Sequence, residues 1–375
     1  MRSTATDATA IGRRALLWGA AVGFGLTLAP GLTRARTRLL VSTARLPDGR
    51  FGVVALEPDG TLRFATPLPG RGHEPVVARG RGEIVVMARR PGRFLAVVGL
   101  ADGALRRSLS APRGRHFYGH AVFDAAGRLL YTTENDYDGG RGVIGVWDVA
   151  AGYVRVGELD AHGIGPHDLA LGRDGRTLAI ANGGLLTHPG SGRAKLNLAS
   201  MEPCLTVLDP TTGEALRRLV LPKELHQLSI RHLAIAPDGG IGFGMQYEGP
   251  LDQGVPLAGI WAPDGTVTLM PQDSAPPAVT RNYVGDLAID ATGRYLAASY
   301  PRGDGVGVWD LRRSRTVGLV RATDACGLAV EDGTDRLWIS DGTGAIGPLD
   351  AGRSLMRDTL VPVPGLAFDN HFARI

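Results

Sequence analysis

The chain has 375 residues, 44% of them hydrophobic, a formal net charge of +4 and only two cysteines, Cys204 and Cys326. So few cysteines exclude a disulfide-framed scaffold, and basic residues interspersed with acidic ones, without a basic run interleaved with aromatics, exclude a nucleic-acid groove. The 54 glycines and 24 prolines, with no long helical periodicity beyond the N-terminal segment, indicate an all-β protein with a turn every few residues.

Residues 1–35 have the pattern of an export signal. Arg13-Arg14 precedes an apolar run, Ala15 to Leu28, whose 14 residues are too short to span a bilayer comfortably. The twin arginine is typical of the pathway that exports folded proteins, so we expect a periplasmic protein cleaved near Ala35; an uncleaved membrane anchor is the alternative. The segment carries four arginines and one aspartate, so cleavage would leave a net charge of +1 and no transmembrane domain.

A short motif recurs along the remaining chain. Its clearest copy, from Gly165 to Gly184, predicts a β-hairpin in which apolar residues alternate after His167 and a turn surrounds Gly175. The residues that take the place of His167 in the successive copies, which we call anchors, are His73, His120, His167, His232, Asp286, Cys326 and Leu366. They are spaced 47, 47, 65, 54, 40 and 40 residues apart, which is the period of four-stranded propeller blades.

The two ends of this repeat array predict a closed ring. The strands expected at Thr37–Ala44, Arg50–Leu56 and Thr61–Ala65 lack an innermost partner, and Gly365–Asn370 can supply it. Residues 36–375 are therefore predicted to form a single seven-bladed β-propeller, WD40/YVTN-like, with six complete blades and one blade shared by the two termini. The third blade contains a long connection, Leu185–Pro203, and its segment Gly190–Lys195 is predicted to be a flexible lid over the channel mouth, or else an inert surface loop.

Several short motifs, in order along the chain, resemble those of a known family. They include His116-Phe-Tyr-Gly-His120, Gly165-Pro-His167, Ala181-Asn-Gly-Gly184, Ser229-Ile-Arg-His-Leu-Ala234 and Asp324-Ala-Cys-Gly327. On these motifs the chain resembles the secreted bacterial family catalogued as domain of unknown function 1513. The resemblance implies a secreted seven-bladed propeller without an established activity, encoded near imelysin-like and di-haem oxidoreductase proteins linked to iron handling, which are the expected partners.

Hairpin geometry predicts where polar groups gather. Because the start of the first strand of a hairpin lies beside the end of the second, each anchor should meet the end of its second strand at one mouth of the channel. His120 should then face Glu134 and Asp136, and His167 should face Asn182. In the later blades, His232 should face Gln246 and Glu248, Asp286 should face Ser299 and Arg302, and Cys326 should face Asp341. By this reasoning the candidate ligand or metal residues are His116, His120, Glu134, Asp136, His167, Asn182, His188, Arg231, His232, Gln246, Glu248, Arg302, Cys326 and Asp341, with His73 and Asp286 as weaker candidates.

Histidine and carboxylate side chains in this number predict one transition-metal ion, Cu, Fe or Zn, because such an ion needs imidazole and carboxylate ligands at about 2.0–2.3 Å. The alternative is structural: each anchor histidine bonds a carbonyl of the neighbouring blade and satisfies the backbone at the channel mouth. A covalently attached c-type haem is excluded, because the sequence has no Cys-x-x-Cys-His motif.

Three functions are compatible with this site. The leading hypothesis is a monomeric periplasmic propeller that binds a metal or a small anionic, metal-chelating ligand at the channel mouth, as an accessory to iron or copper uptake. The first alternative is a propeller enzyme, a lactonase-like hydrolase or an oxidoreductase, with histidine and glutamate as acid and base. The second is a protein-interaction scaffold. The sequence does not separate them, because propellers support all three with the same residue types.

Overall fold

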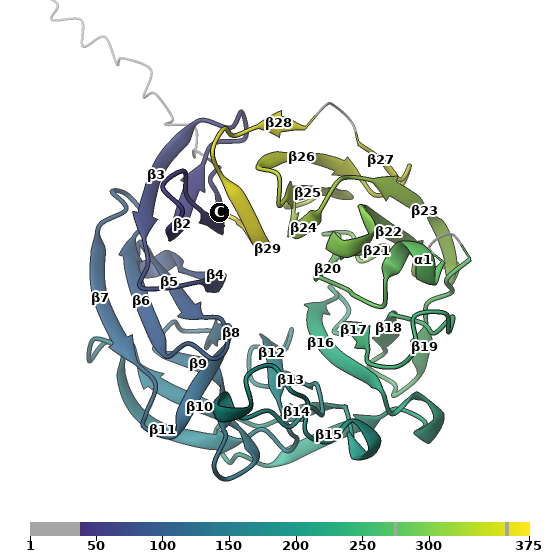
Figure 1. The fold of residues 1–375 in the computed structure, drawn as a ribbon, viewed down its shortest axis with the longest axis horizontal. Helices are drawn as coiled ribbons and strands as arrows, with labels where there is room; N and C mark the ends of the chain where they lie inside the picture. The colour runs from purple at the N-terminus through teal and green to yellow at the C-terminus, as the bar shows by residue number, and fades with distance from the viewer. Residues whose placement is uncertain (1–37, 274–275, 357–359) are drawn as a thin grey trace, which may run out of the picture. The chain divides into compact units, whose positions relative to one another are not determined.

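A computed structural model describes residues 38–273, 276–356 and 360–375, so the expected export signal lies outside the described residues. The described residues form seven antiparallel sheets arranged as blades around a central axis (Figure 1), and we use the word channel for the space between their innermost strands, which side chains fill. This confirms the predicted seven-bladed propeller. Helical structure in these ranges is confined to one short helix, α1 (Pro277–Thr280), and five single 3-10 turns. None of these helices is long and apolar enough to cross a membrane.

Each of blades 1 to 6 uses consecutive strands, the first of them next to the channel. The innermost strands of blades 1 to 7 are β4 (Gly72–Ala78), β8 (Arg115–Phe123), β12 (Pro166–Leu171), β16 (Leu228–Ile235), β20 (Asp286–Ile289), β24 (Ala325–Val330) and β29 (Ala367–Arg374). The second strands are β5 (Glu83–Ala88), β9 (Leu129–Asp136), β13 (Leu178–Asn182), β17 (Ile241–Tyr247), β21 (Tyr295–Tyr300), β25 (Arg336–Asp341) and β1 (Leu40–Arg45).

The outer half of each blade follows the same order. The third strands are β6 (Phe94–Gly99), β10 (Arg141–Asp148), β14 (Cys204–Leu208), β18 (Ala258–Trp261), β22 (Gly305–Asp310), β26 (Ala345–Asp350) and β2 (Phe51–Leu56). The outermost are β7 (Leu105–Ser110), β11 (Val154–Asp160), β15 (Ala215–Val220), β19 (Val267–Leu269), β23 (Arg315–Arg321), β27 (Leu355–Met356) and β3 (Leu62–Pro67). A further short strand, β28 (Val361–Pro362), pairs with β26.

Burial along the strands follows from their place in the ring. Adjacent blades cover both faces of each middle strand, so β5 has a continuous apolar run, Ile84 to Met87, that is fully buried. The outermost strand of the same blade, β7, is polar and mostly exposed. The core therefore lies between blades, and the channel is lined by the ends of the innermost strands.

The chain termini close the ring within blade 7. Strand β29 pairs with β1, with Phe372 opposite Ser42 and Phe368 opposite Ala44, and both phenylalanines are buried in one apolar cluster with Leu40. The predicted closure is confirmed (Figure 1). The strand begins and ends later than Gly365–Asn370, however, and this shift brings His371 rather than Leu366 to the channel.

Six of the seven innermost strands contain a register shift where the anchors lie. The shifts fall between Gly72 and Pro75, Phe117 and Ala121, Pro166 and Asp168, Ile230 and His232, Ala325 and Leu328, and, opposite β29, between Ser42 and Ala44. Strand β20 alone pairs without one. A bulge inserts unpaired residues and turns their side chains out of the ladder, so these bulges direct polar groups into the channel.

Candidate metal centre

Five histidines from five blades converge in the channel. Their ring centroids lie 4.5 to 5.9 Å from those of their neighbours in the group. Four of them are at most 4% exposed. We call this group, together with the carboxylates that face its rings, the histidine centre; its histidines are His73, His120, His167, His232 and His371, and its carboxylates are Glu74, Asp168, Asp286 and Asp369.

Three histidines face a carboxylate at Nδ1, two of them, His120 and His371, within hydrogen-bond distance and the third, His73, at an ion-pair distance without a hydrogen bond. The Nδ1 atom of His120 lies 2.9 Å from Glu74 and 3.2 Å from Asp168. That of His371 lies 3.1 Å from Asp286, and that of His73 lies 3.5 Å from Asp369.

The opposite nitrogen of these three rings, Nε2, is buried and has no hydrogen-bond partner within the described residues. The three residues offer ring nitrogens within 4.8 Å of one another. A histidine whose Nδ1 faces a carboxylate while its Nε2 stays free has the arrangement of metal-ligating histidines, in which the carboxylate fixes the ring and raises its basicity.

The carboxylates are themselves fixed by backbone donors from two blades. Asp168 accepts hydrogen bonds from the amide of Leu169 at 2.7 Å and, in the next blade, from that of Leu233 at 2.8 Å. Asp286 likewise accepts from the amide of the following residue and, across the blade interface, from Leu328 at 2.8 Å. The histidine rings are thus oriented by groups that also hold the blades together.

The remaining two histidines, His167 and His232, lie next to the first three. His120, His167 and His232 form a second group of ring nitrogens within 4.8 Å, and His232, His371 and Asp286 form a third. Both ring nitrogens of His232 are buried and without a hydrogen-bond partner in the described chain, whereas Nδ1 of His167 lies 3.4 Å from Arg231. The groups overlap around one space, so one ion could be approached by several donors.

The electrostatics make most of these rings neutral. Burial, followed by repulsion from His371, lowers the pKa of both His73 and His232 well below the ordinary value. Burial and then Arg231 do the same for the pKa of His167. Neutral imidazoles present lone pairs, which is the form that binds metals.

His120 differs from its neighbours. Burial acts to lower its pKa, but Asp168 and then Glu74 outweigh burial and raise the pKa to about 10. The metal-free centre therefore carries a proton on His120, which an ion binding at Nε2 would displace.

A glycine allows the first two histidine-bearing blades to approach. Gly119 has a φ of +112°, in the bulge of β8, and a Cβ atom built on it would lie 2.5 Å from Cβ of His73. Any other residue at this position would meet both backbone strain and a steric clash. A glycine at position 119 is therefore needed for His73 and His120 to lie close together.

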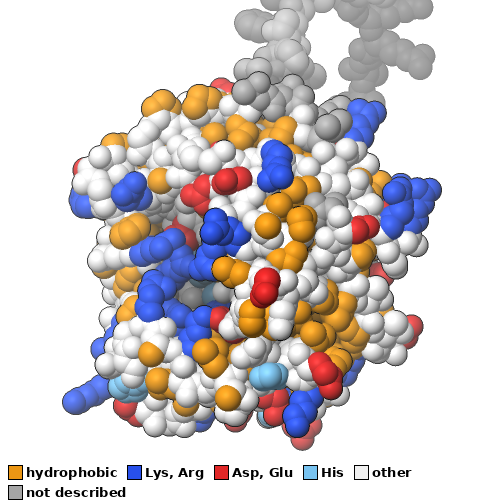
Figure 2. Space-filling model, turned by 45° about the vertical axis from the view of Figure 1, so that its right-hand side comes forward, with side chains coloured by type: hydrophobic (Ala, Val, Ile, Leu, Met, Phe, Trp, Pro, Cys, Tyr) orange, Lys and Arg blue, Asp and Glu red, His pale blue; other side chains and the backbone are white. Residues whose placement is uncertain are grey.

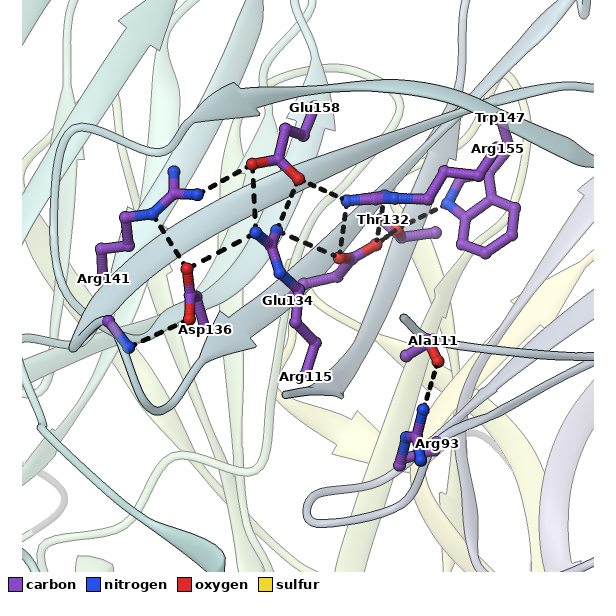
Figure 3. Close-up of polar contacts among 11 residues, drawn as sticks. Arg93, Ala111, Arg115, Thr132, Glu134, Asp136, Arg141, Trp147, Arg155 and Glu158 are labelled. Atoms are coloured by element: carbon purple, nitrogen blue, oxygen red, sulfur yellow. Dashed lines mark hydrogen bonds and ion pairs between the residues drawn. The ribbon is translucent and has the colours of Figure 1, made fainter. Parts of the chain in front are cut away.

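The expected pairing of His120 with Glu134 and Asp136 is wrong. Because the bulge of β8 spans residues 118–120, Glu134 lies opposite Phe117, and Asp136 lies opposite Arg115. Both carboxylates instead belong to an ion-pair network on blade 2 (Figure 3). We call it the Arg–Glu network, and its charged members are Arg115, Glu134, Asp136, Arg141, Arg155 and Glu158.

In blades 3 and 4 the residues expected beside the anchor histidines also lie elsewhere, because β12 and β16 contain bulges too. Gln246 lies opposite Ser229 rather than His232 and donates to the carbonyl of Val284 at 3.1 Å. Asn182 lies opposite Pro166 and donates to the carbonyl of Ala161 at 2.9 Å rather than facing His167.

Glu248 also has partners other than His232. It pairs with Lys195 and lies 3.6 Å from Arg231. It therefore remains at the channel mouth, among basic side chains rather than among the histidines.

The other predicted residues fall into two sets. Asp286 lies opposite Ser299, as expected for the one strand without a bulge. The second set makes local contacts. Arg302 stacks on Tyr283 at 4.1 Å, and Cys326 Sγ lies 3.8 Å from Asp324. Asp341 accepts hydrogen bonds from the amides of Thr343 and Ala345, His188 accepts one from the amide of Gly190, and His116 is hydrogen-bonded to Phe117 and Asn135. Both cysteines are free and buried.

Sequence reasoning missed four residues of the centre: Glu74, Asp168, Asp369 and His371. A signal for the first two was present, since each directly follows an anchor histidine, and a bulge can bring two consecutive side chains to one site. His371 stands 45 residues after Cys326, within the range of the other spacings.

Fold and site together define a β-propeller with a buried histidine–carboxylate centre in its channel. The model of the family described as "Protein of unknown function (DUF1513)" matches residues 66–375, and the chain belongs to this family. No curated protein matches the chain in sequence.

A solved structure titled Kuenenia stuttgartiensis Hydrazine Synthase is similar to the propeller. The TM-score is 0.60 over 80% of this chain and 91% of that chain, at 15% sequence identity. Similarity at this identity supports the propeller fold alone, because unrelated functions share this fold.

Proposed function

We propose that the protein is a periplasmic propeller whose histidine centre binds one transition-metal ion, Cu, Fe or Zn, as an accessory to iron or copper uptake. The observation that carries the proposal is the group of His73, His120 and His371, whose ring nitrogens lie within 4.8 Å of one another, whose Nδ1 atoms face carboxylates and whose Nε2 atoms have no hydrogen-bond partner in the described residues. Imidazole donors suit these three metals, and the carboxylates supply the outer contacts that ligating histidines require.

The structural alternative accounts less well for the same atoms. Histidines that only satisfied the blades would bond to backbone carbonyls, whereas His232 bonds to nothing in the described chain. Each buried polar atom without a partner costs about 1–3 kcal/mol, and an ion bound by the ring nitrogens would offset that cost. The lactonase-like alternative with Glu134 as acid or base also loses support, because Glu134 is enclosed in the Arg–Glu network.

The export and uptake parts of the proposal rest on the sequence. The twin-arginine pattern of residues 1–35 favours the periplasm, and the resemblance to a family associated with imelysin-like and di-haem oxidoreductase proteins favours a role in metal uptake. Replacing Arg13 and Arg14 by lysine should retain the protein in the cytoplasm. Undiminished export of that variant would contradict the proposed route.

Elemental analysis of protein purified without chelator tests the metal site. We expect about one ion per chain in the wild type and its loss from His73→Ala, His120→Ala and His371→Ala. The matched control is His226→Ala, since His226 is bonded only to the carbonyl of Lys223 at the surface. A wild type that binds none of the three metals, or variants that retain the ion, would overturn the proposal.

A further inference from the structure

A cluster of arginines surrounds the channel mouth above the histidine centre. Figure 2 shows a hollow in one face of the molecule with Lys and Arg side chains gathered around it. We call the cluster the arginine vestibule; its members are Arg71, Arg89, Arg90, Arg193 and Arg231, from blades 1, 3 and 4.

Three of these arginines touch the centre directly. Arg231 is 7% exposed, receives its orientation from Ser229 at 2.8 Å, and lies 3.4 Å from Nδ1 of His167. Arg71 and Arg89 both pair with Asp369, the carboxylate that faces His73. A ligand held by the vestibule would therefore sit next to the histidine nitrogens.

The other two arginines complete the positive rim. Arg90 and Arg193 line one small cleft together with His116 and His188. Burial, and then repulsion from Arg231 and from Arg193, lowers the pKa of Arg90. The guanidinium groups thus lie close enough to destabilise one another, which an anion between them would reverse.

Few acidic groups offset this charge. The two carboxylates paired with vestibule arginines are Asp369 and Glu248, and Glu248 is shared with Lys195. Of the other acids, Asp138 lies 3.5 Å from His188 of the cleft, and Asp324 and Asp341 lie beside Cys326 on blade 6. An excess of positive charge therefore remains over blades 1, 3 and 4.

A second, independent feature is the hydroxyl of Tyr118. This side chain is 4% exposed, and its oxygen has no hydrogen-bond partner in the part of the chain that the structure describes. Burial raises the pKa of this hydroxyl, and Thr187, Arg90 and Arg231, which act against that rise, therefore lie near it. A buried hydroxyl without a hydrogen-bond partner, near guanidinium groups that outnumber the carboxylates paired with them, matches an anion with oxygen acceptors.

We propose that the arginine vestibule is a binding site for a small oxyanion, one bearing carboxylate, phosphate or sulfate oxygens, held by Arg90, Arg193, Arg231 and the Tyr118 hydroxyl. Guanidinium groups bind such oxygens in pairs, with matched geometry. The anion site itself depends only on these residues. That the bound oxyanion also reaches a metal in the histidine centre rests on the proposed function.

Calorimetric titration of the metal-free full chain with citrate and, separately, with inorganic phosphate tests the site. We expect at least one of the two probes to bind, and the stronger one to identify the head group. Arg90→Gln and Arg193→Gln should each weaken that binding about tenfold, the loss expected for one charge-assisted contact. Arg193 lies on an exposed connection, so its variant should fold normally. The matched control, Arg353→Gln, changes a surface arginine paired only with Asp350 and should bind as the wild type does.

The outcomes separate this site from the metal centre. His371→Ala should lose the metal and retain anion binding, whereas Arg193→Gln should retain the metal. A protein that binds citrate or phosphate but no metal would overturn the proposed function and support the anion site in the arginine vestibule. Binding of neither anion, equal weakening by Arg353→Gln, or anion binding only after metal loading would overturn the vestibule.

Discussion

The histidine centre and the Arg–Glu network both bury ionisable groups, but only in the network does each charged group face an opposite charge, and we call the network saturated in that sense; its Arg115 Nη1 and Glu134 Oε2 atoms are ion-paired but make no hydrogen bond within the described residues. In the network Glu158 lies within 2.9 Å of Arg115, Arg141 and Arg155, and the enclosed carboxylate of Glu134 lies 3.1 Å from Arg155 (Figure 3). In the centre four histidines keep buried nitrogens without a partner in the described residues. A cluster that satisfies itself holds the fold together, whereas one that leaves donors and acceptors unmatched is built for a ligand.

The largest expected effect comes from breaking the saturated cluster. Glu134→Ala removes a fully buried carboxylate and leaves Arg115 and Arg155 without their inner partner. We expect the free energy of unfolding to fall by about 3 kcal/mol, since an uncompensated buried charge is strongly destabilising. Metal content should not change. Denaturant unfolding and elemental analysis check both statements, and a variant that lost its metal but kept its stability would reverse the assigned roles.

The next effect concerns the backbone that brings the blades together. Gly119→Ala places a methyl group against His73 at a φ of +112°, which costs on the order of 1–3 kcal/mol. Metal affinity should fall as well, because His73 is displaced. Gly127→Ala is the matched control: Gly127 also has a positive φ but nothing within 4 Å of the added atom. If both variants lost metal equally, the clash with His73 would not be the cause.

A third change acts on the centre through its supporting carboxylate. Asp168→Asn keeps an oxygen for the amide of Leu233 but removes the negative charge beside His120. We expect metal affinity to fall about 10- to 100-fold, the usual effect of losing such a contact. The pKa of His120 should fall too, which titration of its ring signals by NMR would report. An unchanged metal affinity would indicate that His120 is not a ligand.

A fourth prediction is a pH dependence of the metal-free protein. The pKa of His120 is raised to about 10 in the folded state, against an ordinary value of 6.5, so the folded state holds this proton more tightly. The resulting stabilisation is fully present below pH 6.5 and is lost as the pH rises toward 10. Melting temperatures measured across this range should decline, and His120→Gln should flatten the decline. Metal affinity should change in the opposite sense, rising over the same range as the proton is lost.

The contrast also shows how far the sequence can predict this protein. Regular repeats of an apolar hairpin predicted seven blades and their closure, because hydrophobic period and turn chemistry determine them locally. Strand bulges were not visible, and the residues that a bulge inserts change which side chains lie opposite each other; in β8 three residues, 118–120, stand against the single Thr133. This is why Glu134 was expected beside His120 and lies in the Arg–Glu network instead.

The strand without a bulge supports this explanation. The pairing of Asp286 with Ser299 was predicted correctly on β20, where the simple alternation holds. Asp168 was overlooked because strict alternation assigns it to the face opposite His167, although the bulge brings its carboxylate within 3.2 Å of His120. His371 was missed because the final strand runs past Asn370 to Arg374.

The central claim is that the unsaturated cluster in the channel holds a transition-metal ion. Its most direct test is a crystal of the protein loaded with Zn²⁺, with diffraction data collected on both sides of the zinc absorption edge. The account predicts one anomalous peak per chain at about 2.0–2.1 Å from Nε2 of His73, His120 and His371. A crystal with no anomalous peak in the channel, or with its only peak on a surface carboxylate, would contradict it.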